Sequence, residues 1–328
     1  MADNNTIKRT EQAELTPAAG VASYEQVQKE HKAYFNIVKK RYLWFALSAL
    51  LLIPSIISLA VQGLNLGIDF TGGTMLDIQF NQKVTQAQIT ESLDSVGLTG
   101  QVQLSQEDTE ALIRTEALDP EKRDALLASI KENAGEFDSE KLGEDLVGPA
   151  IGAELRTNAF KALIVATILI LAYVTLRFRL IYAIGGIVAL AHDILITLGI
   201  FSIFQWQVEA AFIAAILTVF GYSINDTVVI YDRMRENEKR LKKRDSYEDM
   251  VDKSVWQSME RSVKTSMTVL IALFAIFILG GASTKVFALA MIIGVTTGTY
   301  SSIFIASQIV VELRKRFRVN ITKKEAQV

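Results

Sequence analysis

The sequence contains no cysteine and only two histidines, His31 and His192, among its 328 residues. The missing cysteines exclude disulfide bridges, thiolate catalysis and cysteine-ligated metals. Two histidines are too few for a histidine-based metal site without several carboxylate ligands, and we expect no metal and no cofactor. Charged residues make up only 21% of the chain, and the net charge of -2 gives no sign of a nucleic-acid partner.

Apolar sequence is what the chain has in excess, since half of its residues are hydrophobic. A membrane-spanning helix needs about 20 apolar residues. Six stretches meet or approach that length, at residues 43–61, 159–176, 180–204, 208–230, 263–279 and 286–311. We predict that they are six membrane spans. The first is not expected to be a cleaved signal peptide, because its apolar run is too long and no A-x-A-like site follows it.

Lysine and arginine are distributed unevenly between the connections, which predicts the orientation. Ten of them lie between Arg233 and Lys264, whereas the long connection after the first span is strongly acidic. Both termini are therefore expected in the cytoplasm of a bacterial plasma (inner) membrane. The predicted parts are a cytoplasmic tail 1–42, the span 43–61, an extracytoplasmic domain 62–157, a bundle 158–312 that includes a cytoplasmic loop 231–262, and a cytoplasmic tail 313–328.

The long connection between the first two spans has the pattern of a compact α+β domain. Thr85 is suited to cap a helix that ends near Gly97, and Asp119-Pro120 predicts a second helix to about Asn133. Alternating or apolar runs predict strands at 75–80, 102–105, 111–115 and 141–147. The order β-α-β-β-α-β indicates a split βαβ, ferredoxin-like domain. The predicted fold class is thus an α-helical membrane protein with six transmembrane helices and one α+β ferredoxin-like extracytoplasmic domain.

The residues before the first span divide into two parts. Residues 1–22 are polar and low in aromatics, which predicts disorder. Residues 24–40 have the character of an amphipathic helix at the membrane surface, with Tyr34 and Phe35 toward lipid. A solvated helical extension explains the same residues equally well.

An acidic group in the fourth span is the sharpest functional candidate. A charged group inside the bilayer costs at least about 2.5–3.5 kcal/mol, and such groups usually mark an ion pathway or a pair. Asn225 and Asp226 lie in this span, and Tyr222 and Ser223 share the helix face of the aspartate. Arg261, at the start of the fifth span, is the expected partner. A proton relay and a static buried ion pair both remain open.

Other polar residues in the spans are weaker candidates. Arg261 shares a stripe with Thr265, which leads into the fifth span. In the third span His192 and Asp193 are adjacent, so they are not expected to share a face, and either packing or proton handling explains them. The sixth span carries small residues at every fourth position, which favours helix packing inside the chain over a subunit interface: Ala290, Gly294, Gly298, Ser302 and Ala306.

A glycine-rich run follows the first span directly and contains Gly67, Asp69, Phe70, Gly72 and Gly73. Glycines permit unusual backbone angles or close approach. No Lys-Ser/Thr pair follows the run, which argues against phosphate binding. We predict a tight junction between the membrane and the outer domain.

Several of these motifs resemble the SecD/SecF family. The run at 67–74 is similar to its G-x-D-F-x-G-G motif, and residues 147–149 are similar to its V-G-P. Residues 191–193 and 221–226, continued by 232–237, look like the SecF side of the family. The fifth-span pattern R-T-x-x-T-S departs here at Ser262 and includes Lys264, while Thr265 and Ser266 match.

The resemblance implies a SecF-type subunit of the RND superfamily, with six helices and one outer loop per half. Such a subunit pairs with SecD as a heterodimer. It works beside SecYEG and SecA, with a YajC-like protein as a further subunit, and uses the proton motive force to assist preprotein translocation after SecA-driven insertion. The family's fourth-span aspartate falls on Asp226 and its fifth-span arginine on Arg261, which favours the relay. His192, Asp193, Ser223, Asn225, Thr265 and Ser266 would support it.

Three other function classes remain. A proton-coupled RND-type exporter of small molecules or lipids would need an apolar cleft in the outer domain. A scaffold of a membrane complex needs no titrating residue. An intramembrane aspartyl protease would require Asp193 and Asp226 to share a proton, and the G-x-G-D motif is missing. We therefore expect no enzymatic activity.

Overall fold

The computed structural model describes residues 24–30, 34–105, 108–241 and 245–317, and the prediction for residues 1–22 lies outside them. In chain order, its helices and strands are α2 (Tyr24–Glu30), α3 (Arg41–Val61), β1 (Asn65–Leu66), α4 (Ile68–Thr71), β2 (Gly73–Gln79), α5 (Gln86–Ser95), β3 (Gly100–Ser105), β4 (Glu110–Thr115), α6 (Pro120–Asn133), η1 (Ser139–Lys141), β5 (Gly143–Val147), α7 (Pro149–Arg177), α8 (Leu180–Phe204), β6 (Gln207–Val208), α9 (Ala210–Glu238), α10 (Tyr247–Leu279), α11 (Ala282–Ser301), η2 (Ser302–Ala306) and α12 (Ser307–Phe317).

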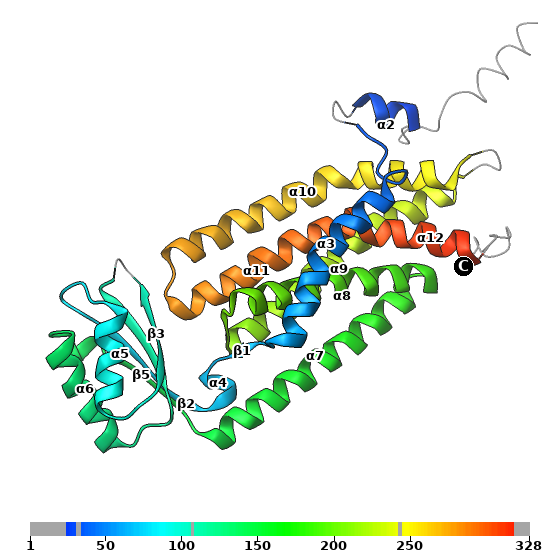
Figure 1. Cartoon of the computed structure of the whole chain (residues 1–328). Coiled ribbons are helices and arrows are strands. Elements are labelled where there is room, and N and C mark those ends of the chain that lie inside the picture. The colour runs from blue at the N-terminus through cyan, green and yellow to red at the C-terminus, as the bar shows by residue number, and fades with distance from the viewer. Residues whose placement is uncertain (1–23, 31–33, 106–107, 242–244, 318–328) are drawn as a thin grey trace, which may run out of the picture.

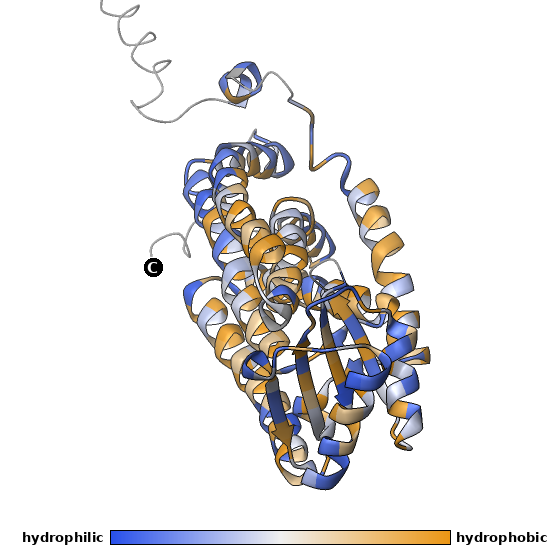
Figure 2. Cartoon of the chain, turned by 90° about the vertical axis from the view of Figure 1, so that its left-hand side faces the viewer, coloured by the Kyte–Doolittle hydropathy of each residue, from blue (hydrophilic) through white to orange (hydrophobic). Residues whose placement is uncertain are grey.

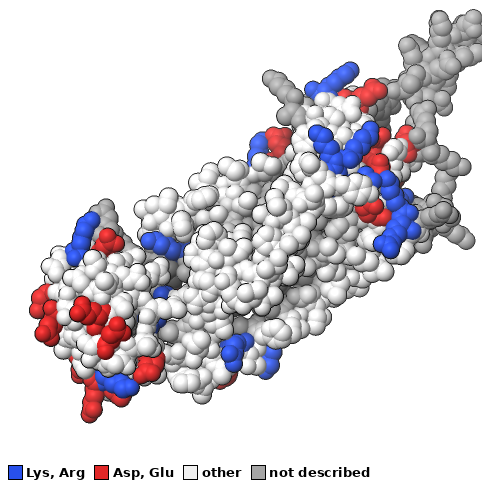
Figure 3. Space-filling view, viewed as in Figure 1, with Lys and Arg blue, Asp and Glu red and all other residues white. Residues whose placement is uncertain are grey.

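Long helices run together as a bundle, and the small α+β domain lies at one end of it (Figure 1). Among the described residues, six helices are long and apolar enough to cross a membrane: α3, α7, α8, α9, α10 and the continuous helix formed by α11, η2 and α12. Apolar residues predominate along these helices, whereas α2 is hydrophilic (Figure 2). In the view of Figure 3 charged side chains gather at the two ends of the molecule, with a largely uncharged band between them. The prediction of a multi-pass membrane protein is confirmed.

The spans differ in how far the chain itself buries them. About half of the apolar window of α8, of α9 and of the last helix is buried, against 11% for α3, 6% for α7 and 17% for α10. Helices α8 and α9 and the last helix therefore form the centre of the bundle. The large apolar surfaces of α3, α7 and α10 are available to lipid or to another membrane protein.

Two helices begin earlier than the apolar runs predict. Helix α7 begins at Pro149, ten residues before the predicted start of the second span, and α10 begins at Tyr247. Because α9 also continues to Glu238, most of the predicted cytoplasmic loop 231–262 is helical. Hydropathy detects only the apolar part of a helix, whereas local caps such as Ser246, which accepts from the third residue of α10, decide where it begins.

The small domain contains a four-stranded antiparallel sheet in the order β3-β4-β2-β5. Helices α5 and α6 follow the first and third of its strands and pack on one face. Ile89 and Ile130 of the helices belong to the same buried apolar core as Ile78 and Ile113 of the sheet. Thr85 and Asp119 cap these helices as predicted. The element succession and strand order agree with the predicted split βαβ arrangement.

The predicted helix of residues 24–40 is present at Tyr24–Glu30 as α2, but residues 34–40 are not helical. Tyr34 and Phe35 pack on the bundle, so the prediction that they face lipid is wrong. Asp252 of α10 is fully buried and accepts a hydrogen bond of 2.6 Å from the Tyr34 hydroxyl. Trp256, one turn further along α10, donates to the carbonyl of Phe35. These specific partners hold the segment in a non-helical course against α10, which a hydropathy pattern does not reveal.

Candidate functional site

A fully buried carboxylate, Asp193 of α8, joins three of the bundle helices. One of its oxygens, Oδ2, accepts hydrogen bonds from Ser223 of α9 at 2.6 Å and from Ser301 of α11 at 2.7 Å. The other, Oδ1, lies 2.9 Å from Nδ1 of His192. A buried charge is tolerated only when such partners compensate for its lost hydration. This carboxylate is therefore a polar centre of the bundle.

His192 extends the same cluster to α3. Its Nε2 lies 3.0 Å from the hydroxyl of Ser48, and its side chain is buried. Although they are adjacent and point in different directions, His192 and Asp193 are both buried in the bundle. Adjacent helix positions point about 100° apart, and α8 is buried on more than one side, so both directions lead to protein.

A further link connects the cluster to the last span. Ser48 donates to the Tyr300 hydroxyl at 3.4 Å, and Tyr300 donates to the carbonyl of Trp44 at 2.9 Å. The five-residue π-helix η2 begins directly after Ser301, and π-helical segments inside α-helices are frequent at functional sites. Sequence reasoning missed Ser48 and Ser301. Their only signal was a hydroxyl within an apolar span.

Asp226 of α9 lies in the bundle interior with 3% of its surface exposed, and its Oδ2 has no hydrogen-bond partner. The predicted partner, Arg261, has an exposed side chain. In the described part of the chain the two form no ion pair within 4 Å, although their charges interact over a longer range. The structure thus brings them into one region without direct contact.

The buried polar stripe of α10 contains Ser266, which is one position after Thr265 of the predicted stripe. Thr265 is exposed and donates to the carbonyl of Arg261, so it lies outside the buried cluster and its supporting role stays a prediction. Ser266 is buried instead, accepting from Tyr222 of α9 at 2.9 Å and lying 2.6 Å from the Thr299 hydroxyl of α11. The sequence did not reveal the rotation of α10, because apolar residues surround both stripes.

Two other predicted residues point away from the bundle. Asn225 is exposed on α9 and does not take part in the buried cluster, so its supporting role stays a prediction. Lys264 forms an ion pair with Glu260 on the exposed side of α10, so it adds no cation beside Asp226.

The glycine-rich run forms the junction between domain and bundle. Asp69 accepts a hydrogen bond of 2.8 Å from the backbone N–H of Ala210, the first residue of α9. Gly67 donates to the carbonyl of Val208, next to the short parallel pairing of β1 with β6. Phe70 is buried in the apolar core of the bundle. The run therefore ties the start of the domain to the start of α9.

The two glycines at its end have left-handed backbone angles. Gly72 has φ +77°, and a Cβ there would lie 2.9 Å from Pro149. Gly73 has φ +143°, and a Cβ there would lie 2.4 Å from the carbonyl oxygen of Thr115. Only glycine can adopt these backbone angles while lying this close to Pro149 and Thr115, because it has no Cβ.

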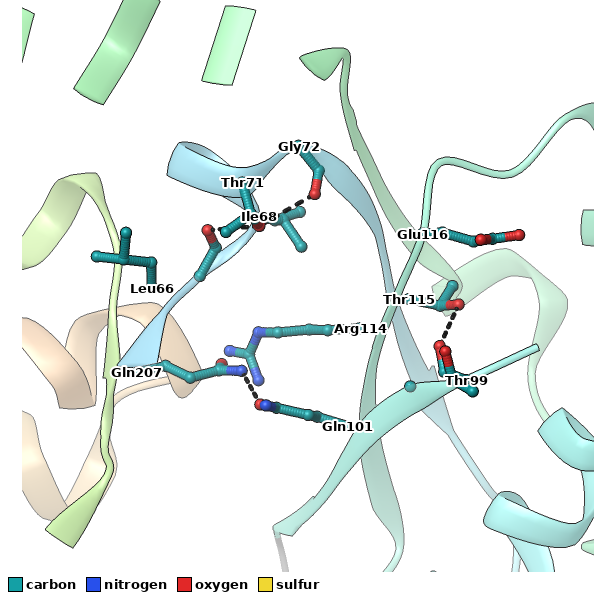
Figure 4. Close-up of a pocket in the computed structure, with 12 residues that line it drawn as sticks. Leu66, Ile68, Thr71, Gly72, Thr99, Gln101, Arg114, Thr115, Glu116 and Gln207 are labelled. Atoms are coloured by element: carbon teal, nitrogen blue, oxygen red, sulfur yellow. Dashed lines mark hydrogen bonds between the residues drawn. The ribbon is translucent and has the colours of Figure 1, made fainter. Parts of the chain in front are cut away.

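A pocket of about 420 Å³ lies between this junction and the sheet (Figure 4). Arg114 extends from β4 across it toward Gln207 and forms a buried ion pair of 2.9 Å with Glu209. Polar residues line much of the pocket, so it does not provide the apolar cleft that a small-molecule or lipid exporter would need.

The small residues of the sixth span pack within the chain. Gly294 faces Val219 of α9, where a Cβ would approach to 2.2 Å, and Gly298 faces Ser223 at 3.1 Å. The preferred interpretation, helix packing inside the chain, is confirmed for these two positions.

The fold and the buried cluster define a multi-pass membrane protein whose central helices meet through acidic and hydroxyl side chains. The SecD/SecF C-terminal model, described as "Protein export membrane protein SecD/SecF, C-terminal", matches residues 127–316, and the SecD/SecF GG motif matches residues 57–84. The chain therefore belongs to the SecD/SecF family of protein-export membrane proteins.

Curated relatives agree with this assignment. The protein translocase subunit SecF of Sebaldella termitidis is 40% identical over 286 residues, which is 85% of this chain and 92% of the relative. The SecF subunit of Vibrio alginolyticus is 39% identical over 274 residues, which is 82% of this chain and 86% of the relative. The similarity thus covers most of both chains.

Solved structures of SecDF have the same fold. The crystal structure of SecDF, a translocon-associated membrane protein from Thermus thermophilus, superposes with a TM-score of 0.79 at 33% identity and covers 95% of this chain. SecDF in its super-membrane-facing form superposes with a TM-score of 0.65 at 32% identity. In both cases this chain spans 42% of the solved chain.

Proposed function

We propose that this chain is a SecF-type subunit that pairs with SecD and uses the proton motive force to assist preprotein translocation through SecYEG after SecA-driven insertion. A YajC-like protein is a further subunit of the complex. The α+β domain lies outside the bacterial inner membrane, both termini lie in the cytoplasm, and the chain itself carries out no enzymatic reaction. The match to 42% of SecDF supports the pairing, because a SecDF chain has room for a second half of similar size.

The observation that carries the proposal is the unpartnered carboxylate of Asp226. An ionised carboxylate buried without hydrogen bonds is costly, so it is stable only when protonated or when a cation comes near. Arg261 is such a cation, exposed and free of ion pairs in the described residues. The carboxylate can therefore exchange between a protonated form and a form paired with the guanidinium.

Movement of α9 provides the coupling to the domain. A proton from outside neutralises Asp226, removes its attraction to Arg261 and lets α9 and α10 shift. Because Asp69 is bonded to the start of α9, a shift of this helix is transmitted to the domain. The membrane potential supplies about 2.3 kcal/mol per charge per 100 mV, enough to move a two-state equilibrium.

The orientation rests on charge. Basic residues lie where α12 ends and on the connection between α9 and α10, at the end of the bundle opposite the domain, in agreement with the positive-inside rule (Figure 3).

One face of α9 is suited to meet SecD. Small or polar residues are exposed along it at Ala214, Thr218, Gly221 and Asn225. Lipid-facing helices expose large apolar residues instead, as α7 does at Ile168. Small exposed residues allow close approach of a second helix within the membrane.

A cross-linking experiment tests this surface. Since the chain has no cysteine, Asn225→Cys gives a single attachment point for a photoactivatable cross-linker. We expect a covalent product with co-expressed SecD. The matched variant Ile168→Cys on α7 is expected to give none. Cross-linking from Ile168 alone would place SecD on a different face.

The function itself is tested in inverted membrane vesicles that contain this chain, SecD, SecYEG and SecA. We expect the chain to increase preprotein translocation, and an uncoupler to remove that increase while SecA-driven translocation continues. A scaffold would increase translocation equally with and without the uncoupler, and that result would contradict the proposal. A protease is not supported, because Asp193 uses both oxygens for other partners and forms no hydrogen bond with Asp226.

A further inference from the structure

The hydrogen bonds around His192 link the positions of its protons to those of its neighbours. Tyr300 has one hydroxyl hydrogen, which it donates to the carbonyl of Trp44. The bond between Tyr300 and Ser48 must therefore use the hydrogen of Ser48. With its only hydrogen so used, Ser48 accepts at its contact with Nε2 of His192, 3.0 Å away. A hydroxyl has one donor hydrogen and two lone pairs, so in this arrangement Nε2 carries a hydrogen. When Ser48 instead donates to Nε2, Nε2 carries none and the bond from Ser48 to Tyr300 is absent.

The other side of the ring then leaves two arrangements. Nδ1 lies 2.9 Å from Oδ1 of Asp193, and two serine hydroxyls already donate to Oδ2. Either Nδ1 also carries a hydrogen and donates to a carboxylate, or a protonated Asp193 donates to Nδ1. Both arrangements contain the same number of protons, and in both the pair has no net charge. A buried site favours this neutrality, because an uncompensated charge there is costly.

We propose that His192 and Asp193 together bind one exchangeable proton and form a second proton site, separate from Asp226. When the proton leaves, His192 keeps a hydrogen only on Nδ1, bonded to the Asp193 carboxylate. Nε2 becomes an acceptor, Ser48 turns its hydrogen toward it, and the bond from Ser48 to Tyr300 is lost. The occupancy of the pair thus determines whether α3 and α11 are linked through this bond.

Among the described residues, no charged side chain of another helix forms a hydrogen bond with His192 or Asp193. In the part of the chain that the structure describes, α3 presents Ser48, α9 presents Ser223, and α11 presents Ser301 and Tyr300. As far as the structure describes the chain, helices α7 and α12 and the segment η2 donate no hydrogen bond to either residue. The next acidic residue along α9 is Asp226, three positions after Ser223.

The link to α3 gives the second site a function, and this part rests on the proposed proton-driven function. Helix α3 leads through β1 directly into the junction at Gly67 and the domain. Proton binding by the pair therefore changes the hydrogen bond that Ser48 donates, and Ser48 belongs to α3, the helix that leads into the domain. Asp226 acts through α9, so the two sites would move the domain from two sides.

The test is nitrogen NMR of histidine in the full-length chain in lipid nanodiscs, labelled with ¹⁵N-histidine. His31→Gln leaves His192 as the only labelled residue. Between about pH 4 and about pH 9, we expect Nε2 to change from protonated to unprotonated while Nδ1 stays protonated or hydrogen-bonded. If Nε2 keeps one state over this range, the proposal is overturned.

Tyr300→Phe removes a bond that exists only with the proton bound. We expect it to weaken proton binding by about two- to tenfold, which lowers the midpoint pH of the Nε2 change. The exposed Tyr173→Phe on α7 is the matched control and should leave the midpoint unchanged. An unchanged midpoint in Tyr300→Phe would contradict the link through Ser48.

The two proposals fail separately. Asp226→Asn is expected to retain the Nε2 change even where export stimulation is lost. An uncoupler-insensitive chain with an intact Nε2 change would refute the proposed function and leave the second proton site standing.

Discussion

Asp226→Asn is expected to reduce the proton-dependent part of preprotein translocation at least about tenfold, which corresponds to about 1.4 kcal/mol of lost coupling. Asparagine has nearly the same shape and fits the buried site, but it cannot exchange a proton. The attraction to Arg261 is therefore permanently absent, and α9 no longer responds to the proton gradient. The measurement is translocation in inverted vesicles with and without uncoupler, together with proton flux.

Asp232→Asn is the matched control on the same helix. Asp232 forms an exposed ion pair of 2.9 Å with Arg177, and such pairs contribute little to stability. Translocation should stay close to that of the unchanged chain. Retention of uncoupler-sensitive translocation in Asp226→Asn would rule out its role as the proton-binding acid.

Gly73→Ala is expected to destabilise the junction of domain and bundle by at least about 2 kcal/mol. The new Cβ would lie 2.4 Å from the carbonyl oxygen of Thr115, in a backbone conformation that L side chains rarely adopt. Neither side can yield easily, because Gly73 belongs to the strand that pairs with both β4 and β5. The measurement is thermal unfolding of the purified full-length chain, with protease resistance of the domain as a second readout.

The matched control is Gly148→Ala at the other connection between domain and bundle. Gly148 has an ordinary backbone angle, and nothing lies within 4 Å of a Cβ at that position. We expect no more than a small change in the unfolding midpoint. Equal effects of the two substitutions would show that close approach at Gly73 is not what constrains this glycine.

Local patterns accounted for much of the architecture. A run of apolar residues is sufficient to identify a span, because the bilayer imposes both length and composition. The caps at Thr85 and Asp119 could likewise be predicted, since a cap involves residues only three positions apart. The start of α10 at Tyr247 was not predicted, because a polar helical segment outside the bilayer has no hydropathy signal.

The candidate site was predicted in part. Asp226 was found because an acidic residue in an apolar span is costly wherever the helix faces. That Asn225 and Thr265 point out of the bundle could not be predicted, since which side of a helix is buried depends on neighbouring helices. On α10 the stripe with Thr265 and the stripe with Ser266 are equally polar. A rotation of the helix by one residue decides which of them is buried.

The amino-acid sequence by itself determined the six spans, the elements of the α+β domain and the presence of acids within the membrane, because each depends on residues close together along the chain. Only the tertiary structure decided that Ser48, His192 and Tyr300 form one hydrogen-bonded chain and that Asp69 holds the start of α9. These partners lie more than a hundred residues apart, and helix packing alone brings them within hydrogen-bond distance.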